Sequence, residues 1–62
     1  MEFDEYLRLK KIDAVAFLHE DPNRFQEWQE TFKTMHPDSF TAQKKFLIND
    51  TRRRYRLIEA VG

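Results

Sequence analysis

Residues 21–37 read DPNRFQEWQETFKTMHP and contain the clearest helical pattern in the chain. Four apolar side chains recur there at spacings of 3, 4 and 3: Phe25, Trp28, Phe32 and Met35. Such spacing places them on one face of a helix, because successive helical residues advance by about 100°. We therefore predict a helix over 22–35 whose apolar face packs against the rest of the chain.

Prolines and capping residues mark both ends of this predicted helix. The fixed φ of Pro22 suits the first helical turn, and the carboxylate of Asp21 before it can accept hydrogen bonds from free N–H groups. At the other end, Pro37 disfavours helical geometry at the residue before it. We expect the chain to turn at this point, with Asp38 or Ser39 as the cap of the next helix.

Two shorter helices are predicted upstream, over 2–11 and 13–20, since apolar residues recur at helical spacing in both ranges. Asp13 can cap the second of these helices. Ile12 and Phe17 then occupy the two positions of a hydrophobic staple, which fixes the angle at which a chain enters a helix. One continuous helix over both ranges is the alternative, because helix propensity does not distinguish the two.

The last helix is predicted over 39–60. Its expected apolar stripe consists of Phe40, Leu47, Ile48, Tyr55 and Ile58, widened by Phe46 and Leu57. Residues 49–51 are Asn-Asp-Thr, which are weak helix formers, so a break at this point is the main alternative. A strand over 54–58 is disfavoured although these residues alternate, because no partner strand is visible in the sequence.

These segments predict an all-α fold, a compact bundle of three to four short helices that forms a single domain over 1–62. With 6 Phe, 2 Tyr and 1 Trp, the chain has the bulky side chains that a core of this size needs. It also has a surplus that can lie at an interface. Phe25, Trp28 and Phe32 are accordingly candidates either for the core or for an aromatic interface.

The composition excludes several functional classes. The chain has 1 Gly and 0 Cys, which rules out a Gly-rich phosphate loop, a disulfide framework and thiolate zinc ligands. Its apolar runs are all shorter than the roughly 18–20 residues of a membrane span. The acidic start of the chain is unlike a secretory signal, so we expect a cytoplasmic protein without a membrane span.

The residue types of catalytic and metal sites are present but poorly placed for either role. His19 and His36 each have carboxylates nearby, yet the predicted helix between them is about 20 Å long, so a shared metal ion is not expected. His36, Asp38 and Ser39 crowd into one turn, which does not suit the geometry of a nucleophile, its base and an orienting group. We therefore predict a protein that is not an enzyme, with no catalytic residue, cofactor, metal site or small-molecule substrate.

Charge is divided along the chain, although the net charge is zero. Residues 1–31 hold eight acidic and four basic side chains, a balance of −4, whereas residues 32–62 hold three acidic and seven basic, a balance of +4. Most of the basic side chains lie in the predicted last helix: Lys44, Lys45, Arg52, Arg53, Arg54 and Arg56. They form either an anion-binding face, on which Tyr55 can stack a base, or a solvated surface whose charges pair with the acidic half.

The sequence supports two functional hypotheses. The first is a small helical interaction module or accessory subunit, without enzymatic activity, that meets a protein partner or a second copy of itself through its aromatic side chains and basic last helix. The second is binding to nucleic acid or another polyanion through the six basic residues named above. The first is favoured, because dedicated nucleic-acid binders usually carry a net positive charge.

Overall fold

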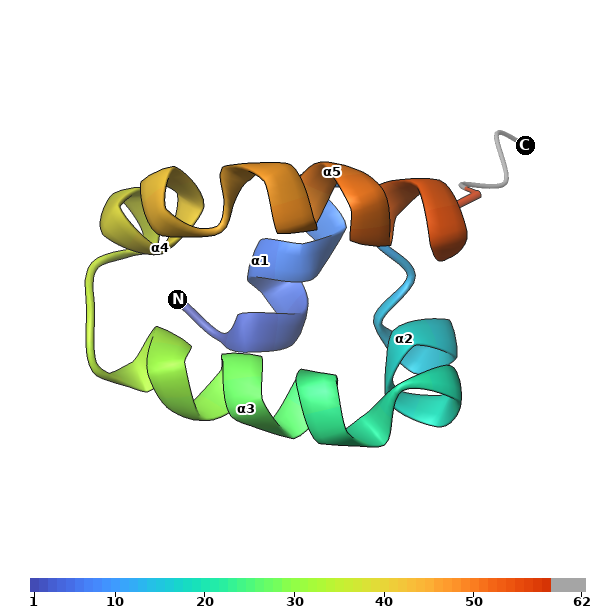
Figure 1. Cartoon of the computed structure of the whole chain (residues 1–62), viewed down its shortest axis with the longest axis horizontal. Coiled ribbons are helices and arrows are strands. Elements are labelled where there is room, and N and C mark those ends of the chain that lie inside the picture. The colour runs from blue at the N-terminus through green and yellow to red at the C-terminus, as the bar shows by residue number, and fades with distance from the viewer. Residues whose placement is uncertain (59–62) are drawn as a thin grey trace.

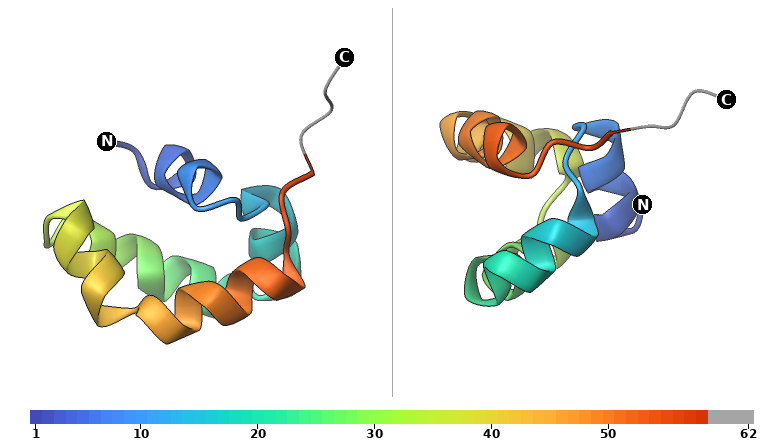
Figure 2. Two further views of the ribbon diagram at one scale, coloured as in Figure 1. Left: turned by 90° about the horizontal axis from the view of Figure 1, so that it is seen from above. Right: turned by 90° about the vertical axis from the view of Figure 1, so that its right-hand side faces the viewer.

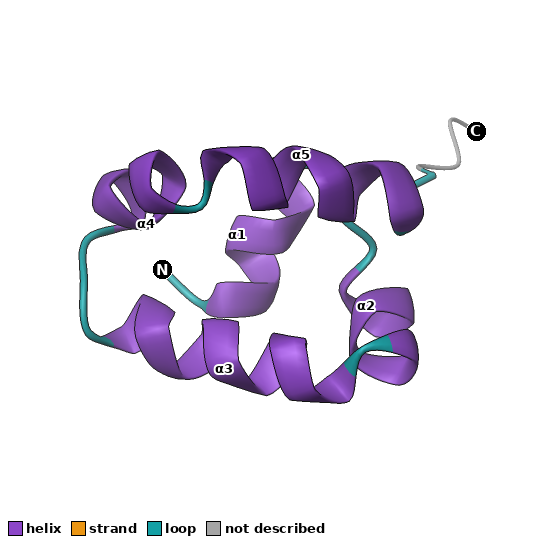
Figure 3. Cartoon of the chain, viewed as in Figure 1, coloured by secondary structure: helices purple, strands orange, loops and turns teal. Residues whose placement is uncertain are grey.

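A computed structural model describes residues 1–58 of the chain, and these residues form helices without any strand (Figure 1, Figure 3). Five helices follow one another: α1 (Phe3–Leu9), α2 (Ala14–Glu20), α3 (Pro22–Lys33), α4 (Pro37–Gln43) and α5 (Lys45–Arg54). The predicted all-α class is confirmed. The described residues contain more helices than the three to four predicted, because the predicted helix over 39–60 is divided.

The helices form two arms, and α1 packs across them. α3 forms one arm, and α4 followed by α5 forms the other, with the turn between α3 and α4 joining them at one end (Figure 1). α1 packs on one face of the two arms, and α2 leads from α1 to the start of α3 (Figure 2). Each helix therefore turns its apolar side toward the space that the arms and α1 enclose.

α1 and α2 are separate helices, so the alternative of one continuous helix is wrong. The chain leaves α1 through Lys11, whose φ of 63° lies in the left-handed region. The Lys11 N–H donates to the Arg8 carbonyl at 3.0 Å, and the Ile12 N–H donates to the Leu7 carbonyl at 2.9 Å. This pair of bonds is a Schellman motif, in which glycine is the usual residue at the left-handed position. α1 consequently ends at Leu9 rather than at residue 11.

The predicted start of α2 is confirmed. The Asp13 carboxylate accepts hydrogen bonds from the N–H groups of Val15 at 3.1 Å and Ala16 at 3.2 Å. Ile12 and Phe17, at the two staple positions, are both buried in the core. The direction of α2 is thus set by the Asp13 cap and by two buried apolar side chains, Ile12 before the cap and Phe17 after it.

α3 is the helix that the sequence predicts best. It begins at Pro22, as predicted, and ends at Lys33, two residues before the predicted end. The expected cap is wrong, because the Asp21 side chain makes no hydrogen bond to the start of the helix. The Asp21 carboxylate instead pairs with Arg24, with 3.4 Å between Oδ2 and Nε.

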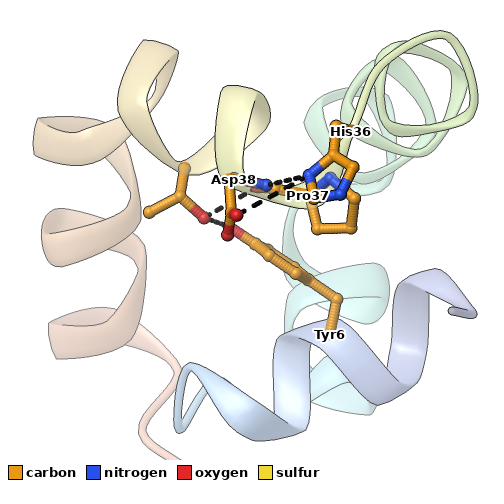
Figure 4. Close-up of polar contacts among 5 residues, drawn as sticks. Tyr6, His36, Pro37 and Asp38 are labelled. Atoms are coloured by element: carbon orange, nitrogen blue, oxygen red, sulfur yellow. Dashed lines mark hydrogen bonds and ion pairs between the residues drawn. The ribbon is translucent and has the colours of Figure 1, made fainter.

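α4 begins at Pro37, two residues earlier than predicted, and its cap is His36. The Nδ1 atom of His36 accepts a hydrogen bond from the Asp38 N–H at 3.2 Å (Figure 4). The expected caps, Asp38 and Ser39, are both inside the helix, so that prediction is wrong. An imidazole nitrogen here accepts the hydrogen bond that a carboxylate or hydroxyl oxygen usually accepts at this position.

The predicted helix over 39–60 bends at Lys44 and not at residues 49–51, which remain helical. Backbone hydrogen bonds continue across the bend, from the Lys44 N–H to the Phe40 carbonyl at 2.9 Å and from the Ile48 N–H to the Lys44 carbonyl at 2.7 Å. The change of direction allows Phe40 and Ile48 both to reach the core.

α5 also ends earlier than predicted, at Arg54. Tyr55 leaves the helix, and its ring stacks on that of Phe17 with centroids 5.5 Å apart and planes at 21°. The remaining described residues, 56–58, continue away from the helix. A tertiary contact therefore replaces the last predicted turns of the helix, and the predicted residues 59 and 60 lie outside the described part.

The apolar stripe expected for the last helix is only partly buried. Phe40 and Ile48 belong to the core, and Tyr55 packs against it. Leu47 is 43% exposed, Phe46 84% and Ile58 86%, so their assignment to the stripe is wrong. The buried side of α5 instead consists of Ile48 and Thr51, since the bend at Lys44 rotates the other apolar residues outward.

The core is mainly aromatic. Its members are Phe3, Tyr6, Leu7, Ile12, Phe17, Phe25, Trp28, Phe32, Phe40 and Ile48. Phe40 lies edge-on to Trp28 and Phe32 with ring centroids 5.7 and 5.5 Å away, and such pairs stabilise a core beyond the area they bury. The apolar face of α3, formed by Phe25, Trp28 and Phe32, is therefore part of the core.

A buried hydrogen bond joins α1 to α4. The Tyr6 hydroxyl lies 2.5 Å from Thr41 Oγ1, and Thr41 Oγ1 lies 3.0 Å from the Pro37 carbonyl. Because the single hydroxyl proton of Thr41 goes to that carbonyl, Tyr6 is the donor to Thr41. Burial raises the pKa of Tyr6 above its usual value of 10.0, and the negative charge of Asp38 adds to this effect (Figure 4).

The first prediction concerns the left-handed residue. Replacing Lys11 with Gly should make the protein more stable than replacing it with Ala, by about 1 kcal/mol, because only Gly has no Cβ to crowd a left-handed backbone. Both variants lose the same side chain, so their difference isolates the backbone effect. Urea unfolding of the two variants measures it, and equal stabilities would contradict the proposed strain.

The second prediction concerns the buried phenol. Its raised pKa means that the folded state holds the proton more tightly, so stability is present below pH 10.0 and falls as the pH rises further. Tyr6→Phe should cost about 1 kcal/mol near neutral pH through loss of the hydrogen bond. Above pH 10.0 the difference between the two proteins should shrink, because Phe cannot ionise. A difference that stays constant in urea unfolding across this range would contradict the assignment.

The third prediction concerns Thr51, which is completely buried and whose Oγ1 has no hydrogen-bond partner within the described residues. Thr51→Val replaces the hydroxyl by a methyl group of similar size, so it should stabilise the protein by about 1 kcal/mol. Thr51→Ser keeps the hydroxyl, removes a buried methyl and should destabilise it. Thermal unfolding checks both, and a lower melting temperature for Thr51→Val would show that the hydroxyl has a partner.

Candidate anion-binding groove

The segment after α5 crosses the turn between α1 and α2. The Asp13 N–H donates to the Tyr55 carbonyl at 2.6 Å, and the Leu57 N–H donates to the Lys11 carbonyl at 3.0 Å. These bonds form an isolated antiparallel bridge between Ile12 and Arg56. Residues 55–57 of the alternating stretch thus pair with another segment, although they form a single bridge and not a strand.

This crossing creates a cationic groove of about 570 Å³. Its lining consists of Lys11, Arg52, Arg53, Arg56 and Leu57. Four of these five side chains are cationic and the fifth is apolar, so none of the carboxylates of residues 1–58 takes part in the lining. Such a concavity gathers positive potential and suits an anionic group.

The structure brings three of the six predicted basic residues together, and they are Arg52, Arg53 and Arg56. The Arg52 guanidinium donates to the Asn49 side-chain oxygen, which restricts its orientation. Within residues 1–58, the side chains of Arg53 and Arg56 are exposed and have no ion-pair partner. These two arginines are therefore the ones available to an external anion.

The other three predicted basic residues lie elsewhere. Arg54 pairs with Asp50, one helical turn earlier, with 3.4 Å between Nε and Oδ2. The Nζ atom of Lys44 lies 6.0 Å from the centroid of the Trp28 ring and covers the core at the bend. Lys45 is exposed at the first residue of α5, about 10 Å along the helix from Arg52. The six residues do not form one face.

Lys11 is the groove residue that sequence reasoning missed. It belongs to the acidic half of the chain, and nothing in the helical periodicity connects it with residues 52–56. The sequence feature that could have indicated this contact is the alternation over 54–58. Its residue Arg56 forms a bridge with Ile12, next to Lys11. Only a fold that brings the two segments together reveals the shared groove.

Tyr55 does not serve as a stacking platform, because its ring packs on Phe17. It packs against the core, as its place in the predicted apolar stripe of the last helix indicates. The exposed aromatic side chain of α5 is Phe46.

Opposite charges gather on the two sides of the crossing. A second groove, of about 430 Å³, is lined by Asp4, Glu5, Asp13 and Arg8 together with apolar residues, and it shares Leu57 with the cationic groove. The ion pairs Asp21–Arg24 and Asp50–Arg54 each join neighbours in the sequence and so do not pair the two halves. Two neighbouring grooves at this end of the molecule therefore have linings of opposite predominant charge.

The histidines are helix-terminal residues in the structure. His36 Nδ1 lies 3.8 Å from Asp38 Oδ2, and both side chains are largely exposed (Figure 4). The described residues contain no group of three or more side chains that could hold a metal ion. None of the helices over 1–58 is long and apolar enough to cross a membrane.

Comparison with protein families, curated proteins and solved structures finds no match to this chain. The functional argument therefore rests on the cationic groove and on the surface around it.

Proposed function

We propose that this protein is a non-enzymatic interaction module that binds an anionic partner through the cationic groove. The observation that supports the proposal is the convergence of Lys11 with Arg52, Arg53 and Arg56 from opposite ends of the sequence. Arg53 and Arg56 have no ion-pair partner within residues 1–58, so an anion bound between them would stabilise the folded state. Arginine also offers a planar fork of donors that matches carboxylate and phosphate oxygens.

The same lining supports a role in binding and not in catalysis. Arginine stays protonated in proteins and so cannot exchange protons as a general acid or base at neutral pH. The groove residues include no nucleophile paired with a base. As part of this proposal the protein is a cytoplasmic module without a cofactor, a view that the absence of cysteine supports.

Self-association is a second candidate, and the adjacent acidic groove favours it. In a two-fold symmetric dimer centred near Leu57, the cationic groove of each copy would meet the acidic groove of the other. Val15 and Ile58 are largely exposed and would add apolar area to the contact. Sedimentation at low and high salt tests it: a dimer that dissociates with salt supports the candidate, and a monomer at low salt rejects it.

The fourth prediction tests the groove itself with inorganic tripolyphosphate as the probe. Replacing both Arg53 and Arg56 with Gln should weaken binding in titration calorimetry at least about tenfold, since hydrogen bonds to charged groups contribute roughly 1.5–3 kcal/mol each. Arg54→Gln is the matched control, because Arg54 is paired with Asp50 outside the groove. Its effect should stay within about twofold, the size expected for a screened charge.

Two results would contradict the proposed function. One is the absence of measurable tripolyphosphate binding at low salt. The other is an equal loss of affinity on replacing Arg54 and on replacing the groove arginines, which would indicate a response to overall charge and not to a site.

A further inference from the structure

The outward side of α5 carries an aromatic residue that the core does not use. Phe46 is 84% exposed, whereas the other phenylalanines of the chain are all buried. Single exposed apolar residues are common on protein surfaces. The exposure of Phe46 alone is therefore not informative, but its position relative to the cationic groove is.

Phe46 lies on the same line of α5 as the groove residue Arg53. They are seven residues apart, which is close to two full turns, so both project from one side of the helix. That side is opposite Ile48 and Thr51, which form the buried side. The separation along the axis is about 10 Å at 1.5 Å per residue. Phe46 and the groove are thus two ends of one exposed track along α5.

Within the described residues, the charges along this track that have no ion-pair partner are positive. Lys45 is exposed beside Phe46 at the start of the helix, and Arg53 and Arg56 lie at the other end. The carboxylate in α5, that of Asp50, is already paired with Arg54. An acidic ligand therefore meets cations at both ends of the track and an aromatic ring at one of them.

We propose that the partner is a single-stranded nucleic acid, with one base stacked on Phe46 and a nearby phosphate held by Arg53 and Arg56. This inference rests on the proposed function and adds the class of partner. In a single strand, phosphates alternate with bases whose faces are free, which matches a track of cations and an aromatic ring. In a duplex the bases stack on one another and offer no face to a side chain.

The chemistry of the track favours a strand over other anions. An acidic polypeptide supplies carboxylates for the arginines but need not supply a flat ring for Phe46. A base supplies a π-face regardless of its identity, so the expected binding is tolerant of sequence. Most acidic residues lie in residues 1–31, and the net charge is zero. We therefore expect a strand to bind at the track and not over the whole surface.

The experiment measures anisotropy of a fluorescein-labelled single-stranded DNA of about eight nucleotides, a length within the usual site size of small binding domains. A second probe is an abasic strand of the same length, which keeps the phosphates and lacks the bases. We expect the strand with bases to bind more tightly than the abasic strand. The logarithm of its affinity should fall with the logarithm of salt concentration, with a slope of about −0.7 per contacted phosphate.

Substitutions at Phe46 separate stacking from apolar contact. Phe46→Leu should weaken binding of the strand with bases at least about fivefold, the lower end of the effect of one stacked base, and should leave the abasic strand unaffected. Phe46→Trp should retain binding. Leu18→Ala changes an exposed apolar residue of α2 away from the track and should have no effect. The exposure of both positions leaves folding intact, which circular dichroism checks.

The outcomes distinguish this inference from the proposed function. Equal binding of the two strands, or no response to Phe46→Leu, overturns the inference, while tripolyphosphate binding that depends on Arg53 still supports the groove. Preferential binding to phosphatidylserine vesicles that persists in Phe46→Leu also overturns it, because a membrane needs apolar area and not an aromatic face. If neither strand nor tripolyphosphate binds, both proposals fail.

Discussion

Two backbone hydrogen bonds, between the turn at residues 11–13 and the segment at 55–57, are the constraint on which the rest of the structure depends. They end α5, hold Tyr55 against Phe17 and bring the basic end of the chain beside Lys11. They form only because Lys11 adopts a left-handed conformation, which reverses the chain after α1. The left-handed backbone at Lys11 thus brings the two segments together that line the cationic groove.

The aromatic core is the second feature that this arrangement requires. A chain of this size without disulfides obtains much of its stability from well-packed apolar area. Edge-to-face contacts around Phe40 link rings from α1, α3 and α4, so three helices meet on one side chain. The bend at Lys44 has its physical reason here, because it directs Phe40 and Ile48 into the same core while the backbone hydrogen bonds continue.

Zero net charge has a different meaning in three dimensions than in the sequence. At the crossing, a cationic and an acidic groove share Leu57, so charges of opposite sign line two neighbouring surfaces. A molecule of this kind presents a local positive site without being attracted to anions in general. Under the proposed function, selectivity among anions would come from the shape of the groove and from the side chains next to it on α5.

The sequence by itself determined the helical class, the position of α3 and the cap of α2. These features depend on local chemistry: the spacing of Phe25, Trp28 and Phe32, the fixed backbone of Pro22, and the carboxylate of Asp13. Such effects act within a turn or two of the chain, so they can be read without a structure. The basic composition of residues 52–56 was readable for the same reason.

Only the tertiary structure decided the bend at Lys44, the end of α5 and the site. Each depends on contacts between segments far apart in the sequence, such as Tyr55 on Phe17 and Leu57 on Lys11. Residues 54–58 could also form backbone hydrogen bonds by continuing the helix. Their helix propensity therefore did not indicate that Tyr55 and Leu57 form backbone hydrogen bonds with the turn at residues 11–13 instead. The groove could not be predicted because Lys11 enters it only through that long-range pairing.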